Sequence, residues 1–260
     1  MPVDRSALKA EARRRLREAR PRPYYTGLLY VFLSGALTVL SILILSAKLT
    51  PEAADHYLRL FLAGRYEDAL DYLAALYPST GEYLLSRVLE LVRGIVGVGL
   101  SVFALHLARG EEASLWNLLD GFSRIFLPLL VLATLILVSL WTQLFIIPGI
   151  IAAYRYRLAV YLMLDHPELN PLQAILLSGR MMRGRKWQLF LLDLSFAGWA
   201  LLAMLPYLVL SSFPGLAMQI AGGVGSALIL AWLLPYYELS CVGFYEAVKT
   251  PLRIEPPEEP

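Results

Sequence analysis

The sequence has few of the residues from which proteins build reactive sites. It contains one cysteine, Cys241, which excludes an internal disulfide. Its three histidines, His56, His106 and His166, fall in different segments without the spacing of metal ligands. Nucleophile-elbow, phosphate-loop and dinucleotide-binding motifs are absent as well. We therefore expect no catalytic residue, no metal and no other cofactor, and hence a protein that is not an enzyme.

Charge is also scarce. Charged residues make up 17% of the chain, against about 25% in ordinary soluble domains. Hydrophobic residues make up 58%, and the mean hydropathy is +0.58. This composition excludes an ordinary soluble protein and indicates a bilayer environment. The net charge of +2 is small, so we expect no nucleic-acid partner.

Long apolar segments predict the fold class. A helix needs about 20 residues to cross the hydrocarbon core, and Tyr24–Ala47 contains no charged residue. The segment Ile125–Tyr154 is likewise uncharged. These runs predict an all-α polytopic integral membrane helical bundle, with about six transmembrane helices plus interfacial amphipathic helices. The predicted spans, within a single membrane domain at 24–250, are 24–48, 86–108, 125–147, 150–164, 187–212 and 216–237.

Three polar segments accompany these spans. Residues 1–23 hold eight Lys/Arg against three acids and predict a basic amphipathic helix, which either lies on an anionic membrane surface or only sets topology. Residues 49–82 predict a helical hairpin outside the bilayer on the outer side. Residues 251–260 are acidic and proline-rich, which predicts a disordered tail.

The distribution of basic residues predicts the orientation. The N-terminal segment, the loop 109–124, the cluster 180–186 and the C-terminal tail together hold sixteen Lys/Arg, whereas 48–93 holds five. Basic residues accumulate on the cytoplasmic side of membrane proteins. We therefore expect both termini to lie in the cytoplasm, which six crossings satisfy.

Pro148 and Gly149 predict a helix break near the end of the long uncharged segment. The chain would then return through 150–164 as a short helix. Whether this return helix crosses the bilayer fully or is re-entrant stays open at the level of sequence. Either arrangement gives the same parity of crossings.

Asp193 is the most informative polar residue within an apolar run. A carboxylate in hydrocarbon is costly and is expected to face a partner inside the bundle. A helix rises 1.5 Å per residue, so Asp193 lies about 10 Å inward if Lys186 marks the membrane interface. By the same measure, Arg157 and Arg155 lie about 12 and 15 Å inward from Asp165. These similar depths predict an intramembrane ion pair between Asp193 and Arg157 or Arg155.

A basic cluster precedes this run. Arg180, Arg183, Arg185 and Lys186 are interpreted as determinants of orientation, with contact to anionic headgroups as the alternative. Trp187 and Trp199 are predicted to be interface anchors, because tryptophan favours the membrane boundary.

Segments 142–175 and 178–199 resemble the two signature regions of a bacterial integral membrane family, the domain of unknown function 975. In that family a helix ends in a similar IPG, an aromatic-rich helix leads to Asp-x-Pro, and a basic helix precedes Lys-Trp and Asp-Leu-Ser-Phe. The matching positions are Pro148, Gly149, Tyr154, Tyr156, Asp165, Pro167, Met182, Gly184, Lys186, Trp187, Asp193, Leu194, Ser195, Phe196 and Trp199. The resemblance implies a multi-span protein of the bacterial cytoplasmic (inner) membrane. It supplies no substrate, because the family has no assigned reaction.

Two functional hypotheses follow. The first is a non-catalytic membrane protein that organises membrane lipid, through anionic headgroups, or a membrane protein partner or homo-oligomer. The second is a small transporter or permease with a polar core at Asp193 and Arg155 or Arg157. A water-filled cavity that reaches Asp193 would favour transport, whereas a dry packed core would favour the first hypothesis.

Overall fold

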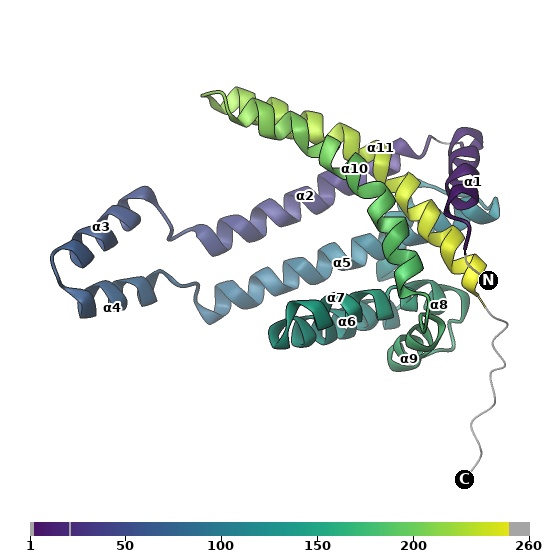
Figure 1. The fold of residues 1–260 in the computed structure, drawn as a ribbon, viewed down its shortest axis with the longest axis horizontal. Helices are drawn as coiled ribbons and strands as arrows, with labels where there is room; N and C mark the ends of the chain where they lie inside the picture. Colours follow the sequence, from purple (N-terminus) through teal and green to yellow (C-terminus); the bar gives the residue numbers. More distant parts are fainter. Residues whose placement is uncertain (1–2, 21, 250–260) are drawn as a thin grey trace, which may run out of the picture. The chain divides into compact units, whose positions relative to one another are not determined.

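The computed structural model describes residues 3–20 and 22–249, and within these ranges every regular element is a helix (Figure 1). Six of the helical segments are long and apolar enough to cross a membrane. The predicted all-α, multi-span fold class is therefore confirmed. The tail predicted at 251–260 lies outside the described residues.

Eleven α-helices and one 3₁₀ helix occur in the described ranges. They are α1 (Arg5–Glu18), α2 (Tyr24–Ser46), α3 (Pro51–Leu62), α4 (Tyr66–Leu76), α5 (Thr80–Arg109), η1 (Leu115–Phe122), α6 (Phe126–Leu144), α7 (Ile146–Tyr156), α8 (Ala159–Asp165), α9 (Pro171–Met181), α10 (Lys186–Ser211) and α11 (Leu216–Val248). Contacts divide the chain into two compact units. One comprises residues up to Val31 and from Ile95 onward, and the other Phe32–Gly94.

The smaller unit contains the helical hairpin α3–α4, which lies where the sequence predicts a hairpin at 49–82. Thr50 caps α3 by accepting from the backbone N–H of Ala53, and Gly64 turns the chain with a φ of 75°. The rings of His56 and Tyr72 pack edge to face with centroids 4.5 Å apart. The hairpin is thus a structured element within its unit.

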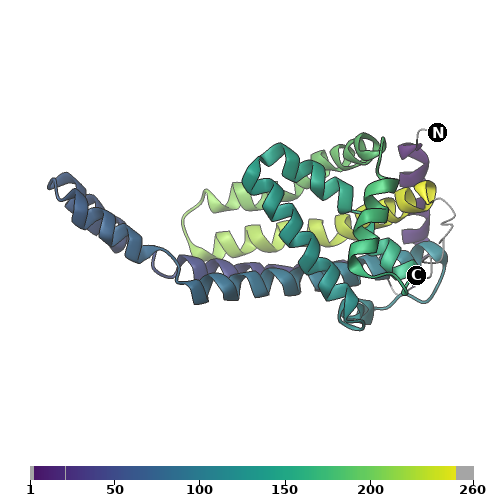
Figure 2. The ribbon, with the colours of Figure 1, turned by 90° about the horizontal axis from the view of Figure 1, so that it is seen from below.

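In the larger unit, α10 and α11 lie side by side over much of their length (Figures 1 and 2). They are joined at Ser212–Gly215, where Gly215 has a φ of 117°. A Cβ at Gly222 would lie 2.9 Å from the carbonyl oxygen of Pro206, so the absence of a side chain lets the two helices approach closely. Helix α11 continues to Val248 rather than ending near 237 as predicted, because residues 239–242, 244 and 245 remain buried.

The break predicted at Pro148–Gly149 occurs earlier. Helix α6 ends at Leu144, and Phe145 is the one extended residue before α7 begins. Pro148 occupies the first turn of α7, where a missing backbone N–H costs nothing. Gly149 packs on Thr142, since a Cβ at Gly149 would lie 2.1 Å from the Thr142 hydroxyl oxygen. The two helices therefore form a tight hairpin.

The return helix predicted at 150–164 is divided in two. Helix α7 ends at Tyr156 and α8 begins at Ala159, with Arg157 and Leu158 between them. Leu158 has a ψ of −6°, which departs from regular helix geometry. The interruption places the Arg157 side chain at the junction of two helices.

The N-terminal helix α1 packs on protein rather than lying free on a surface. Leu8 packs against Gly243 of α11, since a Cβ added at Gly243 would lie 3.1 Å from the Leu8 Cδ2 atom. Ala12 is buried. The Lys9 ammonium donates to the carbonyl oxygen of Ser195 at 3.1 Å, and Arg5 donates to that of Leu191. Burial, followed by repulsion from Arg13 and Arg5, lowers the pKa of Lys9. Thus α1 is a bound part of the larger unit.

Helices η1 and α9 both contact α6 and both leave apolar side chains exposed. In η1 the exposed residues include Trp116 and Leu119, and in α9 they include Leu172 and Leu176. The opposite side of α9, with Ala174, Ile175 and Ser178, is buried. The Asn170 side chain caps α9 by accepting from the backbone N–H of Gln173, and Pro171 occupies the first turn of the helix.

Candidate functional site

Asp193 of α10 is held by two tyrosines. The hydroxyl of Tyr154 on α7 donates to Asp193 Oδ2 at 2.8 Å, and the hydroxyl of Tyr237 on α11 donates to Oδ1 at 3.0 Å. Within the described residues, Asp193 forms no ion pair with either Arg155 or Arg157. The predicted ion pair is therefore corrected: Asp193 does face the bundle, but hydroxyl groups satisfy it.

Arg157 pairs instead with Glu238 of α11. One guanidinium nitrogen, Nη2, lies 3.4 Å from Glu238 Oε1 and also donates to the Tyr237 hydroxyl at 3.3 Å. Because Tyr237 in turn donates to Asp193, it bridges Arg157 and Asp193. The arginine and the aspartate thus belong to one network without touching.

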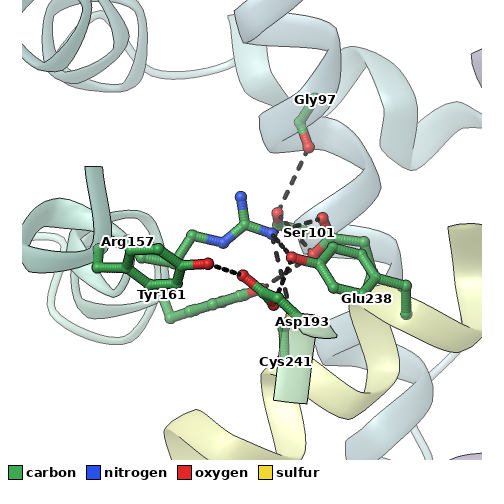
Figure 3. A network of polar contacts seen from close by, with 9 residues as sticks. Gly97, Ser101, Arg157, Tyr161, Asp193, Glu238 and Cys241 are labelled. Atoms are coloured by element: carbon green, nitrogen blue, oxygen red, sulfur yellow. Dashed lines mark hydrogen bonds and ion pairs between the residues drawn. The ribbon is translucent and has the colours of Figure 1, made fainter. Parts of the chain in front are cut away.

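Two further hydroxyl groups complete the network (Figure 3). Tyr161 of α8 donates to Glu238 Oε2 at 2.9 Å, and Ser101 of α5 donates to the same oxygen at 3.4 Å. We call the seven residues Ser101, Tyr154, Arg157, Tyr161, Asp193, Tyr237 and Glu238 the polar core. The polar core connects five helices, α5, α7, α8, α10 and α11. Its arginine, Arg157, lies between α7 and α8.

The polar core contains two carboxyl groups and one guanidinium. It is therefore one positive charge short of neutrality if both acids are ionised. A proton or a small cation would balance it, and water reaching Arg157 would lower the cost of the imbalance. Among the described residues, no group of three or more His, Cys, Asp or Glu side chains could hold a metal ion.

Arg155 points away from the polar core. Its side chain lies over Gly179 of α9, where a Cβ would meet Nε at 2.8 Å, and its backbone carbonyl accepts from the Ser178 hydroxyl. The prediction of Arg155 as a partner of Asp193 is wrong. Arg155 instead helps to join α7 to α9.

A cavity of about 240 Å³ borders one side of the polar core. It is lined by Ser101, Arg157 and Tyr161 together with residues of α6 such as Thr134 and Val138. The Arg157 side chain is 38% exposed, and the cavity accounts for an open side beside it. Asp193 does not line this cavity, so the open space reaches the arginine and not the aspartate.

Helix α1 contacts α10 beside Asp193. Lys9 and Arg5 contact the backbone of Ser195 and Leu191, which lie two residues on either side of Asp193. Helix α1 also carries the exposed Arg13 and Arg14, which are costly in hydrocarbon. Basic side chains of α1 therefore lie next to the segment of α10 that contains Asp193.

A second polar cluster joins three helix ends near Asp165. Arg109 Nη2, at the end of α5, lies 2.7 Å from Asp165 Oδ1 and 2.7 Å from Glu246 Oε1. The Tyr245 hydroxyl donates to Asp165 Oδ2 at 2.7 Å, and Lys249 contacts the same oxygen. The rings of Tyr161 and Tyr245 stack with centroids 5.3 Å apart, which connects this cluster to the polar core.

The predicted headgroup contacts differ in their surroundings. Arg180 and Arg183 are exposed and take part in no ion pair among the described residues. Arg185 donates to the carbonyl oxygen of Val248 at 2.9 Å and so caps α11. Lys186 is partly buried at the start of α10. Only the first two are therefore free to meet an external anion.

The predicted anchors Trp187 and Trp199 are both more than half exposed. Trp187 stacks on Phe190 with centroids 4.9 Å apart, and Phe190 packs edge to face on Tyr154. An exposed aromatic side chain is thus connected to a polar-core residue through one ring. Their role as membrane anchors remains a prediction.

Sequence reasoning missed four residues of the polar core, the hydroxyl-bearing Ser101, Tyr161 and Tyr237 and the acidic Glu238. Glu238 follows directly after the predicted end of the last span at residue 237. The mostly apolar segment 239–244 that follows it is the available signal, because a helix that continues into this segment carries Glu238 into the bundle.

Residues 138–251 match the family described as "Protein of unknown function (DUF975)". The match confirms the resemblance, and it contains every residue of the polar core except Ser101. No curated protein and no solved structure matches the chain.

Proposed function

We propose that this protein, which carries a DUF975 domain at residues 138–251, is a non-catalytic membrane protein that binds anionic lipid headgroups at its aqueous interface. In this proposal the polar core holds the helices together, and the exposed surface of α9 contacts the lipid. The six candidate membrane spans support the membrane setting.

The surface of α9 and the start of α10 supports the proposal. The side chains of Leu172 and Leu176 on α9 are 65% and 56% exposed. The helix itself is well defined, with an N-terminal capping box. Arg180 and Arg183 follow at the end of the same surface, and Trp187 adds an exposed ring. Exposed apolar residues bordered by cations and a tryptophan are typical of a helix lying in the interface. We call this set of five residues the α9 surface.

A lipid titration tests the α9 surface. The double variant R180Q/R183Q removes two cations, each contributing about 1 kcal/mol near an anionic surface, which predicts roughly 30-fold weaker binding of phosphatidylglycerol. Native mass spectrometry of the detergent-purified protein measures the bound lipid. The control R59Q/R65Q removes two exposed arginines of the α3–α4 hairpin and should leave binding unchanged. Equal loss in both doubles would contradict a site on α9.

A transporter or permease is the second candidate, because the cavity and the charge imbalance meet at Arg157. A conducting path requires water at that cavity. In a C241S background, T134C should then react with a charged, membrane-impermeant thiol reagent, since Thr134 lines the cavity. Absence of labelling at T134C in protein that labels at an exposed control, S79C, would count against transport.

We further propose a bacterial cytoplasmic membrane location with both termini in the cytoplasm. The excess of Lys and Arg in the N-terminal segment and the cluster 180–186 supports this orientation. Reporter fusions that are active only in the cytoplasm should be active at either end. Activity of a periplasmic reporter at the N-terminus would contradict the orientation.

A membrane protein partner or a second copy of the chain is also part of the proposal. The α3–α4 hairpin supports it through exposed side chains such as Phe61, Leu62 and Leu70. Purification in mild detergent, with the bound proteins and lipids identified, should recover a partner or an oligomer together with lipid. A monomer that carries neither lipid nor partner would contradict both parts.

A further inference from the structure

We infer that a second lipid site lies at the corner between α1 and α2, where a basic cavity beside α11 binds the phosphate group of one anionic phospholipid. The cavity has a volume of about 370 Å³, within the usual range for ligand sites. Its cationic lining residues are Arg17, Arg20 and Arg22, and its aromatic lining residues are Tyr24 and Trp232. We call these five residues the corner site.

The walls of the corner site are fixed by close packing. Pro235 cannot donate a backbone hydrogen bond to the carbonyl of Ala231, which leaves that carbonyl open within α11. Gly27 of α2 fits against it, since a Cβ at Gly27 would lie 2.0 Å from the Ala231 oxygen and 3.0 Å from the Pro235 ring. This contact fixes the position of α2 along α11, beside the corner site.

The arginines of the corner site have no anionic partner in the described part of the chain. Arg17, Arg20 and Arg22 are exposed and occur in none of its ion pairs. By contrast, Arg14 and Arg15 on the same helix both pair with Glu11. Three cations that converge on one cavity without an acid favour a phosphate ligand.

The apolar surroundings identify the anion as part of a lipid. Tyr24 begins the 23-residue apolar helix α2, and Trp232 is exposed on α11 at the level that Gly27 fixes. Aromatic side chains at this position mark the boundary between headgroups and acyl chains. Leu28 and Leu228 continue the exposed apolar surface from there, so acyl chains can extend along α2 and α11 while the phosphate stays at the arginines.

This inference deepens the proposed lipid-binding function but uses none of the residues of the α9 surface. The two sites can therefore fail separately. Loss of binding in R180Q/R183Q alone would support α9 only, and loss in the corner variants alone would support the corner site only.

The test is native mass spectrometry of the full-length protein titrated with phosphatidylglycerol or phosphatidylcholine. Replacing Arg17, Arg20 and Arg22 by glutamine should weaken one phosphatidylglycerol binding event roughly a hundredfold, because each arginine contributes about a factor of five. The variant R17K/R20K/R22K keeps the charge and should bind within about tenfold of wild type. The control R14Q removes an arginine of α1 that is already paired with Glu11 and should bind as wild type does.

Three outcomes would overturn the corner site. Unchanged phosphatidylglycerol binding in the glutamine triple variant is the first, and equal binding of phosphatidylcholine is the second. The third is displacement of the lipid by millimolar inorganic phosphate, which would identify a soluble anion as the ligand. Photo-crosslinking from position 232 gives an independent readout if the triple variant fails to fold, since it should attach phosphatidylglycerol in the otherwise unaltered protein.

Discussion

At the scale of single residues, the polar core is held together by hydroxyl groups as much as by charges. Tyr237 contacts both Asp193 and Arg157, and Tyr161 contacts Glu238. A tyrosine can donate one hydrogen bond and accept another, so Tyr237 joins an acid and a base that lie on different helices. This explains how Asp193 is satisfied without an arginine beside it.

Removing one charge of the Arg157–Glu238 pair should cost more than removing both. E238L leaves the guanidinium beside apolar groups and should lower the free energy of unfolding by about 1–3 kcal/mol, a range set by the partial exposure of Arg157. The double variant R157M/E238L should recover part of this loss. Thermal unfolding in detergent gives the comparison, and strictly additive losses would show that the two side chains are not coupled.

Tyr237 should be more sensitive than an exposed tyrosine. Y237F removes the hydroxyl that bridges Arg157 and Asp193, which should cost about 1–2 kcal/mol of stability. Y207F removes an exposed hydroxyl from α10 and serves as the matched control. Indistinguishable unfolding temperatures for the two variants would contradict the bridging role.

The partners of Asp193 show what sequence alone could supply. That Asp193 needs partners from other helices followed from its apolar neighbours, and the structure places Tyr154 and Tyr237 on α7 and α11. The identity of these partners could not be predicted from the sequence. The depth estimates compare charged residues only, and they treat each helix as straight. At Leu158 the backbone departs from regular helix geometry, and no residue pattern marks this interruption.

At the scale of elements, the α6–α7 hairpin has an unusual tip. Leu144, Phe145, Ile146 and Ile147 form it, and each is between 62% and 71% exposed. Four adjacent exposed apolar residues are unfavourable in water. We therefore propose the re-entrant alternative for this segment, in which the tip of the hairpin stays within the bilayer.

Accessibility of the tip tests this interpretation. In a C241S background, I146C should react with no membrane-impermeant thiol reagent, whether the reagent is added to intact cells or to inverted membranes. G64C, in the turn of the α3–α4 hairpin, should react from the outside. Reaction of I146C from the outside would instead mean that α6 and α7 each cross the membrane.

Close packing at Gly149 predicts a second effect on the same hairpin. G149A places a methyl group against Thr142 and should cost about 1–3 kcal/mol by overpacking. G198A in α10 meets open space and should be neutral or slightly stabilising. Equal unfolding temperatures for G149A and wild type would show that the hairpin opens readily.

At the scale of the whole chain, apolar runs predict the positions of two of the long helices closely. Helix α2 occupies 24–46 where the sequence predicts 24–48, and α10 occupies 186–211 where it predicts 187–212. The packing of α1 was not predictable in this way. Its contacts with Ser195 and Gly243 depend on backbone carbonyls and on space beside a glycine, and neither is visible in hydropathy or charge.

The central claim is that the protein recognises anionic lipid through exposed arginines at its interface. The most direct measurement is native mass spectrometry of the wild-type protein in an equimolar mixture of phosphatidylglycerol and phosphatidylcholine. The account predicts at least two bound phosphatidylglycerol molecules, one at α9 and one at the corner site, before any phosphatidylcholine binds. Equal occupancy by the two lipids would contradict it.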